Sequence, residues 1–288
     1  MGPAMAERLP AHKARLRQSL MKTIALLYHD VIAGEGQQDT SGFQGADADL
    51  YKLDTRLFNA HLHAIREANA SQPVLTLESP RSPASKRYPL LLTFDDGGAS
   101  AITQTAQALA AYGWLGYFFI TTDYIGSPGF LNAEQIRALR QIGHVIGSHS
   151  CSHPSRMSAC SERQLSAEWG QSIEQLSQIL GGPVHTASVP GGHYSRRVGR
   201  AASQAGIKIL FTSEPTVRSH QIEDCLVLGR FSVQRSTPAS NVAAIARGEI
   251  LPRLAQALLW NAKKVVKIAG GATYLKARKA LLRDKSVR

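Results

Sequence analysis

The sequence of 288 residues lacks several features that mark specialised classes of protein. No run of 18 apolar residues occurs, which argues against a conventional membrane-spanning helix. Three cysteines are too few for a disulfide scaffold, and their uneven number fits a reducing compartment. No internal repeat and no low-complexity segment stand out. With 43% hydrophobic and 19% charged residues, the chain is expected to be a folded globular protein of one large domain or two small ones.

The net charge of +12 is concentrated at the two ends of the chain. Residues 1–22 hold five Lys or Arg and one Glu, and residues 252–288 hold ten Lys or Arg and one Asp. Residues 23–251 hold 18 basic and 19 acidic residues, so the main part of the chain is close to neutral. A neutral main domain argues against a nucleic-acid-binding face, and we expect no nucleic acid among the partners.

These ends suggest a basic N-terminal extension (1–22), a main domain (23–251) and a basic C-terminal helical segment (252–288). The N-terminal extension has no apolar core of signal-peptide length, so we expect no cleaved export signal and a cytoplasmic protein. The C-terminal segment shows helical apolar spacing, with a second basic helix expected over 274–282. It either packs on the domain and ends in a solvated tail, or contacts an anionic membrane surface.

Short apolar runs alternate with helical stretches through the main domain. Seven runs are expected to form strands: 23–28, 90–94, 116–121, 144–147, 187–189, 209–211 and 226–228. Five stretches between them are expected to form helices: 54–68, 99–112, 132–141, 161–180 and 195–205. This alternation is typical of an α/β protein with a mainly parallel sheet, and about seven units in this length favour a distorted (β/α) barrel forming a single main domain.

Proteins of this architecture carry their chemistry at the carboxyl ends of the strands. Most of the clustered His and Asp residues of this chain follow directly after a predicted strand. They are His29, Asp30, Asp95, Asp96, His149, His153 and His193. The agreement between residue type and position predicts an active site at this edge of the sheet.

Two elements within this set suggest a metal. Asp95 and Asp96 end an apolar strand, where adjacent carboxylates are costly unless a cation or hydrogen-bond donors lie beside them; the alternative is an Asp that caps the following helix. His149 and His153 are four residues apart and would lie on one face of a helical turn; the alternative is a pair of unrelated loop histidines.

Asp96, His149 and His153 together would bind one divalent metal ion, preferably zinc, with cobalt, nickel or manganese as alternatives. Three protein ligands leave a coordination position open for water, as in catalytic sites. Asp95 would then be free to take a proton from that water. Cys151, between the histidines, is expected to be a small packing residue.

The motifs resemble those of polysaccharide deacetylases with a NodB-homology domain, carbohydrate esterase family 4. Residues 93–97 read TFDDG, and residues 149–153 read HSCSH and match the family's H-S/T-x-x-H. The resemblance covers about 88–235. It implies a distorted (β/α) barrel, Asp95 as catalytic base, the Asp and two His ligands named above, and hydrolysis of an acetamido group on a sugar.

The third family motif, R-x-P-x-G, reads SVPGG over residues 188–192. In the family, this Arg holds the catalytic Asp, and Ser188 stands in its place here. Asp95 must therefore be kept ionised by other residues or by the charge of the metal. By resemblance, the Pro-Gly-Gly turn lies at the substrate, with the backbone N–H near Gly191 as the oxyanion donor; by itself it would be only a turn. The residues of this turn are Pro190, Gly191 and Gly192.

The last two family motifs have no evident counterpart, and the general-acid histidine is among the missing residues. Arg230 lies near its place, but the pKa of a guanidinium is too high for it to donate a proton. His193 and His29 are the candidates for this role, and either could instead be a polar rim residue. Residues 28–30 read YHD and resemble the start of deacetylases associated with exopolysaccharide synthesis.

We therefore expect a metal-dependent hydrolase that removes N-acetyl groups from an N-acetylated sugar or polysaccharide. One alternative is another amide hydrolase on the same metal site, such as a deformylase or a ring-amide hydrolase. A second is a catalytically impaired carbohydrate-binding protein, suggested by the missing Arg and general-acid His. A basic C-terminus would suit an enzyme that meets lipid-linked or nascent glycan at the inner membrane surface.

Overall fold

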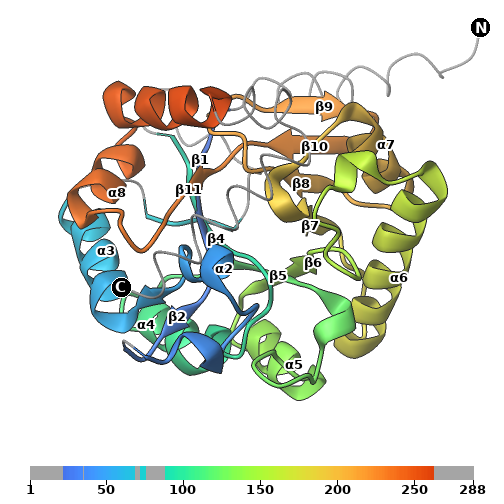
Figure 1. The fold of residues 1–288 in the computed structure, drawn as a ribbon, viewed down its shortest axis with the longest axis horizontal. Coiled ribbons are helices and arrows are strands. Elements are labelled where there is room, and N and C mark those ends of the chain that lie inside the picture. The colour runs from blue at the N-terminus through green and yellow to red at the C-terminus, as the bar shows by residue number, and fades with distance from the viewer. Residues whose placement is uncertain (1–21, 35, 69–71, 76–87, 263–288) are drawn as a thin grey trace, which may run out of the picture.

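The computed structural model describes residues 22–34, 36–68, 72–75 and 88–262, and all structural statements below concern these residues. Figure 1 shows a curled sheet surrounded by helices. Its nine strands lie in the order β11-β1-β4-β5-β6-β7-β8-β10-β9. All neighbours in this sheet are parallel except β9, which is antiparallel to β10.

The nine strands of this sheet are β1 (Ile24–Tyr28), β4 (Leu90–Phe94), β5 (Tyr117–Ile120), β6 (Val145–Ser148), β7 (Thr186–Ser188), β8 (Ile209–Phe211), β9 (His220–Ile222), β10 (Cys225–Leu228) and β11 (Phe231–Ser232). A separate parallel pair consists of β2 (Val31–Ile32) and β3 (Leu53–Asp54). The curled, mainly parallel sheet confirms the expected α/β barrel, in the form of a half-barrel that forms one main domain.

The longer helices are α3 (Thr55–Glu67), α4 (Ala106–Ala110), α5 (Ala133–Gln141), α6 (Glu162–Leu180), α7 (Arg196–Gln204), α8 (Ala239–Ala246) and a helix over 250–262. Shorter helical elements are η1 (Gln38–Thr40), α2 (Ala46–Asp49), the π-helix η2 (Ala101–Thr105), η3 (Thr122–Tyr124), η4 (Met157–Ala159) and η5 (Pro190–Gly192). All seven predicted strands and five predicted helices are present within one or two residues of their expected ends, the predicted helix 99–112 as η2 followed by α4.

The elements that sequence patterns missed are short or atypical. Strands β2, β3 and β11 have two residues each, too few for an alternation to be recognised. Helix α8 lacks a side-chain cap. The helix over 250–262 runs across the boundary placed between 251 and 252, and the second basic helix expected over 274–282 lies outside the described residues.

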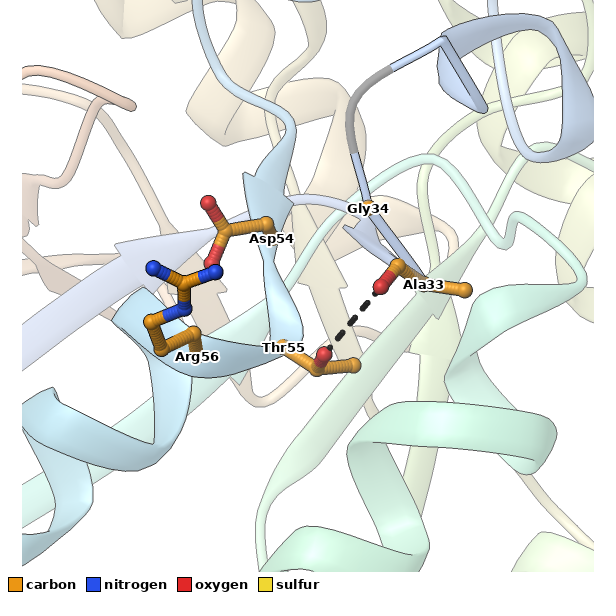
Figure 2. Close-up of a pocket in the computed structure, with 5 residues that line it drawn as sticks. All are labelled: Ala33, Gly34, Asp54, Thr55 and Arg56. Carbon is orange, nitrogen blue, oxygen red and sulfur yellow. Dashed lines mark hydrogen bonds between the residues drawn. The ribbon is translucent and has the colours of Figure 1, made fainter.

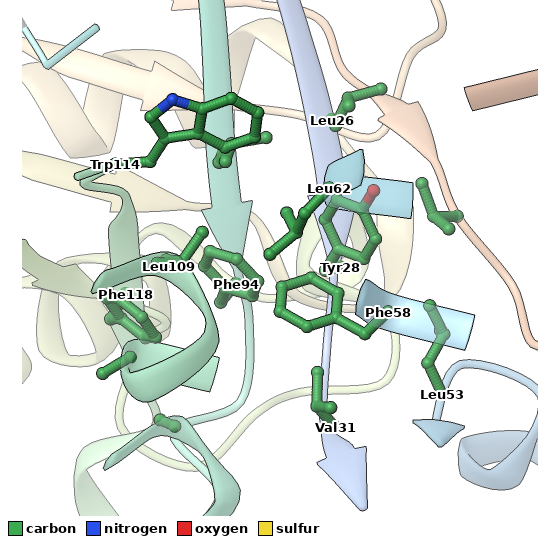
Figure 3. Packing of buried hydrophobic residues seen from close by; sticks show 14 of the residues in the cluster. Leu26, Tyr28, Val31, Leu53, Phe58, Leu62, Phe94, Leu109, Trp114 and Phe118 are labelled. Atoms are coloured by element: carbon green, nitrogen blue, oxygen red, sulfur yellow. The ribbon is translucent and has the colours of Figure 1, made fainter. Parts of the chain in front are cut away.

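The sheet is covered by apolar side chains on its outer face, and this cluster fixes the strand ends that carry the site (Figure 3). Tyr28 of β1 packs edge-on against Phe58 of α3, with ring centroids 5.4 Å apart. Tyr28 also stacks on Phe94 of β4 at 5.6 Å, and Phe94 stacks on Phe118 of β5 at 4.8 Å. Strands β1, β4 and β5 are buried along their whole length, which explains their continuous apolar sequences.

Two long helices have clear start signals in the sequence. Asn132 and Gln135 form a reciprocal capping box at the start of α5, and Ser161 and Gln164 form another at the start of α6. Gly181 ends α6 in the left-handed conformation. Among the described residues, no helix combines the length and the apolar character needed to cross a bilayer.

Candidate metal centre and active site

The carboxyl ends of the parallel strands bring the predicted site residues to one edge of the sheet. His29 follows β1, Asp95 and Asp96 follow β4, and His149 follows β6. The backbone N–H of Asp95 donates to the carbonyl of Tyr28, so the ends of the two neighbouring strands are held together. Asp95, Asp96 and His149 are all buried.

Asp96, His149 and His153 converge as the sequence predicted. His149 Nε2 lies 3.4 Å and His153 Nε2 lies 3.6 Å from Asp96 Oδ1. One ligand atom from each of the three residues lies within 4.8 Å of the others. His149 Nδ1 lies 3.0 Å from the carbonyl oxygen of Ser188, to which it can donate, leaving the Nε2 lone pair directed at the centre. This donor set fits a divalent metal such as zinc.

The electrostatics of the three residues agree with this role. Burial and the nearby His149 lower the pKa of His153 to about 4, so its ring is neutral at neutral pH. Burial alone would raise the pKa of Asp96, but the hydrogen bond from His149 and the nearby His29 and His153 hold it below its usual value. Burial works to lower the pKa of His149, whereas Asp95 and Asp96 raise it overall, so a metal at Nε2 would displace a proton.

The two histidines do not lie on a helical turn, and that prediction was wrong. Residues 149–153 form a loop in which Ser150 and His153 have φ values of 65° and 56°. Asp96 also has a positive φ, 78°. Backbone strain of this kind persists only where surrounding contacts enforce it, and it is often found at functional sites.

Glu168 of α6 supplies the contacts that hold the histidine loop. Its Oε2 accepts hydrogen bonds from the backbone N–H of Cys151 at 2.9 Å and of Ser152 at 3.0 Å. Its Oε1 accepts from Ser152 Oγ at 2.6 Å. These hydrogen bonds to Glu168 hold the loop in its conformation, as the backbone hydrogen bonds of a helical turn would otherwise have done. Cys151 is buried between the histidines and is not part of the metal cluster, as expected for a packing residue.

Arg230 is the functional residue that sequence reasoning missed. Its fully buried guanidinium forms two parallel hydrogen bonds to Asp95, from Nη1 to Oδ1 at 2.7 Å and from Nη2 to Oδ2 at 2.8 Å. Nη2 also donates to Ser188 Oγ at 2.9 Å, and Ser188 Oγ donates to Asp95 Oδ2 at 3.0 Å. A bidentate pair of this kind is the strong form of a charge-assisted hydrogen bond.

The Arg that is absent at position 188 is thus supplied by the turn between β10 and β11. Burial alone would raise the pKa of Asp95, but Arg230, with His149 and His29, holds it below its usual value, so Asp95 is ionised. The available signal was an arginine within an otherwise apolar run, between Leu228 and Phe231. A buried charge in such a place requires a partner of opposite sign.

The two candidate proton donors differ in position. His29 lies close enough to Asp95, Asp96 and His153 for its charge to affect the pKa of each of them. Its ring packs on Tyr51 at 4.7 Å, and within the described part of the chain its buried Nδ1 has no hydrogen-bond partner. His193 follows η5 and is half-buried.

The Pro-Gly-Gly turn forms η5, two residues beyond the end of β7. Gly191 has φ +65°, and a Cβ at this position would lie 2.8 Å from the carbonyl oxygen of Ser155. A Cβ at Gly192 would lie 2.5 Å from Ser213 Oγ. The turn therefore requires glycine for its conformation and for its close packing. The role of the Gly191 N–H as oxyanion donor stays a prediction.

The loop between β2 and β3 is fastened over the site by the buried carboxylate of Asp30. Its Oδ1 accepts hydrogen bonds from Ser41 Oγ at 2.6 Å and from Ser100 Oγ at 2.9 Å. The backbone N–H of Gly42 donates to the carbonyl of Gly129 at 2.8 Å. This network fixes the loop at the point where it passes the metal-binding residues.

Phe43 of this loop lies against the metal-binding cluster. Its ring centroid is 4.7 Å from that of His153, 4.9 Å from that of Tyr124 and 5.1 Å from that of Phe130. All three aromatic rings are half-buried. They form an aromatic wall, Phe43-Tyr124-Phe130, directly beside one metal ligand.

A separate depression of about 460 Å³ lies at the end of the β2–β3 pair (Figure 2). Thr55 Oγ1 donates to the carbonyl of Ala33 across it, at 3.4 Å. Its lining residues are Ala33, Gly34, Asp54, Thr55 and Arg56. None of them belongs to the predicted site, so this depression is not the active site.

Comparison with known sequences relates part of this chain to one family of enzymes. Residues 83–210 match the family described as polysaccharide deacetylase. A curated relative, YxkH of Bacillus subtilis (strain 168), whose name assigns it to the polysaccharide deacetylases, is 23% identical over 199 residues. The match covers 67% of this chain and 65% of the relative.

Two solved structures show the same fold. The Streptococcus pyogenes deacetylase PplD, solved in complex with acetate, superposes with a TM-score of 0.64 and 18% identity, covering 79% of this chain and 99% of that one. IcaB from Ammonifex degensii superposes with a TM-score of 0.62 and 20% identity, covering 79% and 97%. His29 and Arg230 both lie outside the residues matched by the family.

Proposed function

We propose that this protein is a metal-dependent hydrolase that removes N-acetyl groups from an N-acetylated sugar or polysaccharide. The observation that carries this proposal is the buried Arg230–Asp95 pair beside the Asp96, His149 and His153 cluster. It provides an ionised carboxylate that is free of the metal and next to it. The match of residues 83–210 to the polysaccharide deacetylase family and the likeness to deacetylase structures support the choice of reaction.

A divalent metal held by Asp96, His149 and His153 would acidify a bound water and polarise the acetyl carbonyl. Asp95, kept ionised by Arg230, accepts the proton of the attacking water. Each carboxylate oxygen has two lone pairs, and the hydrogen bonds from Arg230 and Ser188 leave room for this proton. A backbone N–H at Gly191 would donate to the developing oxyanion.

Of the two candidates for protonating the leaving amine, we favour His29. Its proximity to Asp95 and its unpartnered buried Nδ1 support this role. The Arg230–Asp95 pair also removes one of the two reasons for a catalytically impaired carbohydrate-binding protein. Zinc as the metal and a cytoplasmic location remain predictions, to be tested by elemental analysis of the isolated protein and by cell fractionation.

Acetate release from N-acetylhexosamine oligomers, measured together with metal content, tests the proposal. We expect Asp95→Asn to keep the metal and to lower kcat about 100-fold or more, because the base is lost. Asp96→Ala should lose the metal and the activity together. Full turnover by Asp95→Asn, or no acetate release by the metal-loaded protein, would contradict the proposal. Formylated and cyclic amides in the same assay distinguish the other amide hydrolases.

His29→Gln and His193→Gln compare the two proton donors directly. We expect His29→Gln to lower kcat about 100-fold with the metal retained, and His193→Gln to have a much smaller effect. The expected loss should be smaller for a substrate with a better leaving group, because such a group needs less protonation. The reverse order of the two variants would assign the role to His193.

The aromatic wall suggests how a sugar ring is held. Phe43 presents an apolar face beside His153, and aromatic faces pack well on the C–H face of a pyranose. We expect Phe43→Ala to raise KM for N-acetylhexosamine oligomers about 10-fold with little change in kcat. Ile142→Ala, a change of an exposed apolar residue directly after α5, is the control and should leave KM unchanged.

A further inference from the structure

The helix over 250–262 exposes most of its apolar side chains to solvent. Six large hydrophobic residues of the described chain are exposed, and five of them lie on this helix. Their exposed fractions are 64% for Ile250, 81% for Leu251, 52% for Leu254, 70% for Leu258 and 63% for Leu259. The sixth is Ile142, at 53%. Scattered exposed leucines are normal, but a continuous group on one short helix marks an interaction surface.

The side of the helix that faces the protein is mixed: Arg253 and Gln256 lie on it, beside the half-buried Pro252, Ala257 and Trp260. Gln256 accepts a hydrogen bond from the backbone N–H of Ser232 at 3.0 Å and donates to the carbonyl of Ser232 at 2.8 Å. The Arg253 guanidinium lies 5.5 Å from the ring centre of Tyr88 and donates to the carbonyl of Gly248 at 2.7 Å. A surface helix usually buries its large aliphatic residues, whereas this helix leaves Ile250 and its four leucines exposed.

The edge of the sheet explains why Gln256 faces the protein. Ser232 belongs to β11, the end strand of the sheet. The neighbouring Val233 N–H donates to Leu27 of β1, so the N–H and C=O groups of Ser232 point away from β1. Gln256 satisfies both groups of this exposed edge. The orientation of the helix, and therefore the exposure of its leucines, is fixed by these contacts.

The charge of the chain that follows indicates what covers the apolar face. Residues 263–288 hold nine Lys or Arg and one Asp. A second copy of the chain would bring two such basic segments together, and their repulsion would oppose pairing. A lipid surface with anionic headgroups suits both features, because it accepts apolar side chains and attracts nearby basic residues.

We propose that the exposed apolar face of the 250–262 helix, together with the basic residues after it, docks this protein peripherally on an anionic lipid bilayer. The leucines enter the boundary between headgroups and acyl chains, and the lysines and arginines interact with the headgroups. This inference does not depend on the proposed reaction. It identifies a second surface of the molecule, separate from the metal site.

Co-sedimentation of the full chain with phosphatidylglycerol-containing vesicles tests the proposal. We expect binding that weakens with added salt and is much weaker with pure phosphatidylcholine vesicles. The double variant Leu251→Gln/Leu258→Gln should bind about 10-fold or more weakly, because two apolar side chains no longer enter the bilayer. The variant Lys263→Gln/Lys264→Gln/Lys267→Gln should lose binding to anionic vesicles to a similar or smaller degree.

The control is Ile142→Gln, which removes an apolar side chain that is 53% exposed and lies outside the helix; it should bind like the unaltered chain. Circular dichroism of each variant shows whether the fold is kept. The proposal is overturned if the intact chain does not sediment with anionic vesicles, or if Ile142→Gln weakens binding as much as the leucine changes. It is also overturned if light scattering shows a dimer that the leucine changes dissociate and no vesicle binding is found.

Discussion

The candidate metal ligands and the residues that lower the pKa of Asp95 reach the same edge of the sheet by different routes. Asp96, His149 and His153 come from two five-residue motifs within the segment that matches the polysaccharide deacetylase family. His29 and Arg230 come from outside that segment: His29 follows β1, the neighbour of β4, and Arg230 lies in the turn between β10 and β11, which are near opposite ends of the sheet order. Short motifs therefore encode the ligands, whereas charge compensation depends on which strands the fold places next to each other.

Removal of Arg230 should have the largest effect, because it leaves the buried Asp95 without its counter-charge. We expect Arg230→Leu to lower the free energy of unfolding by about 3–5 kcal/mol, measured by urea denaturation. Any folded fraction should lose most of its acetate release, because a buried carboxylate without a cation becomes protonated.

The double variant Arg230→Leu/Asp95→Asn makes the test specific to the ion pair. No uncompensated charge remains in it, so it should regain much of the lost stability, although it stays inactive. Equal stability of Arg230→Leu and the double variant would show that Arg230 contributes by packing alone. The claim that Arg230 compensates the charge of Asp95 would then be wrong.

Gly98→Ala should have an intermediate effect and tests the fastening of the loop beside the site. A Cβ at Gly98 would lie 1.9 Å from Asp30 Oδ1 and 2.6 Å from Ser41 Oγ. We expect a loss of about 1–3 kcal/mol in the free energy of unfolding. Gly170→Ala is the control, because its Cβ would meet nothing within 4 Å and it lies inside α6. It should be neutral or stabilising by about 0.5–1 kcal/mol; equal losses in both variants would argue against a role for Asp30.

Protonation of His144 should have the smallest effect on stability. This residue and His149 lie at the two ends of the same strand, β6. His144 precedes β6, whereas the metal ligand His149 follows it. Burial lowers the pKa of His144 to about 4, and its Nδ1 accepts a hydrogen bond from the Gly116 N–H at 3.2 Å. Since the unfolded chain binds the proton first, stability is complete above the ordinary pKa of 6.5 and falls as the pH decreases toward 4.

Urea denaturation at pH 7 and pH 5 measures this effect. His144→Asn keeps an acceptor for Gly116 but does not titrate in this range. We expect the unaltered chain to lose about 1–2 kcal/mol more than the variant between these two pH values. Identical losses in both proteins would mean that His144 does not contribute to the pH dependence of stability.

The sequence by itself determined the alternation of strands and helices and the residues of the candidate metal site. Continuous apolar runs identify strands buried on both faces, and the two capping boxes identify the starts of α5 and α6. The TFDDG and HSCSH motifs identify the three ligands and the free carboxylate, because each motif contains its functional residues within five positions.

Only the tertiary structure decided three further properties. The histidine loop is held by Glu168 instead of by a helical turn, since a contact across 16 or more residues leaves no local pattern. Arg230 replaces the Arg missing at Ser188, because adjacent ends of the curled sheet bring positions 135 residues apart into contact. The 250–262 helix has apolar residues on more than one side, and the hydrogen bonds from Gln256 to the β11 edge decide that Ile250 and the four leucines face outward.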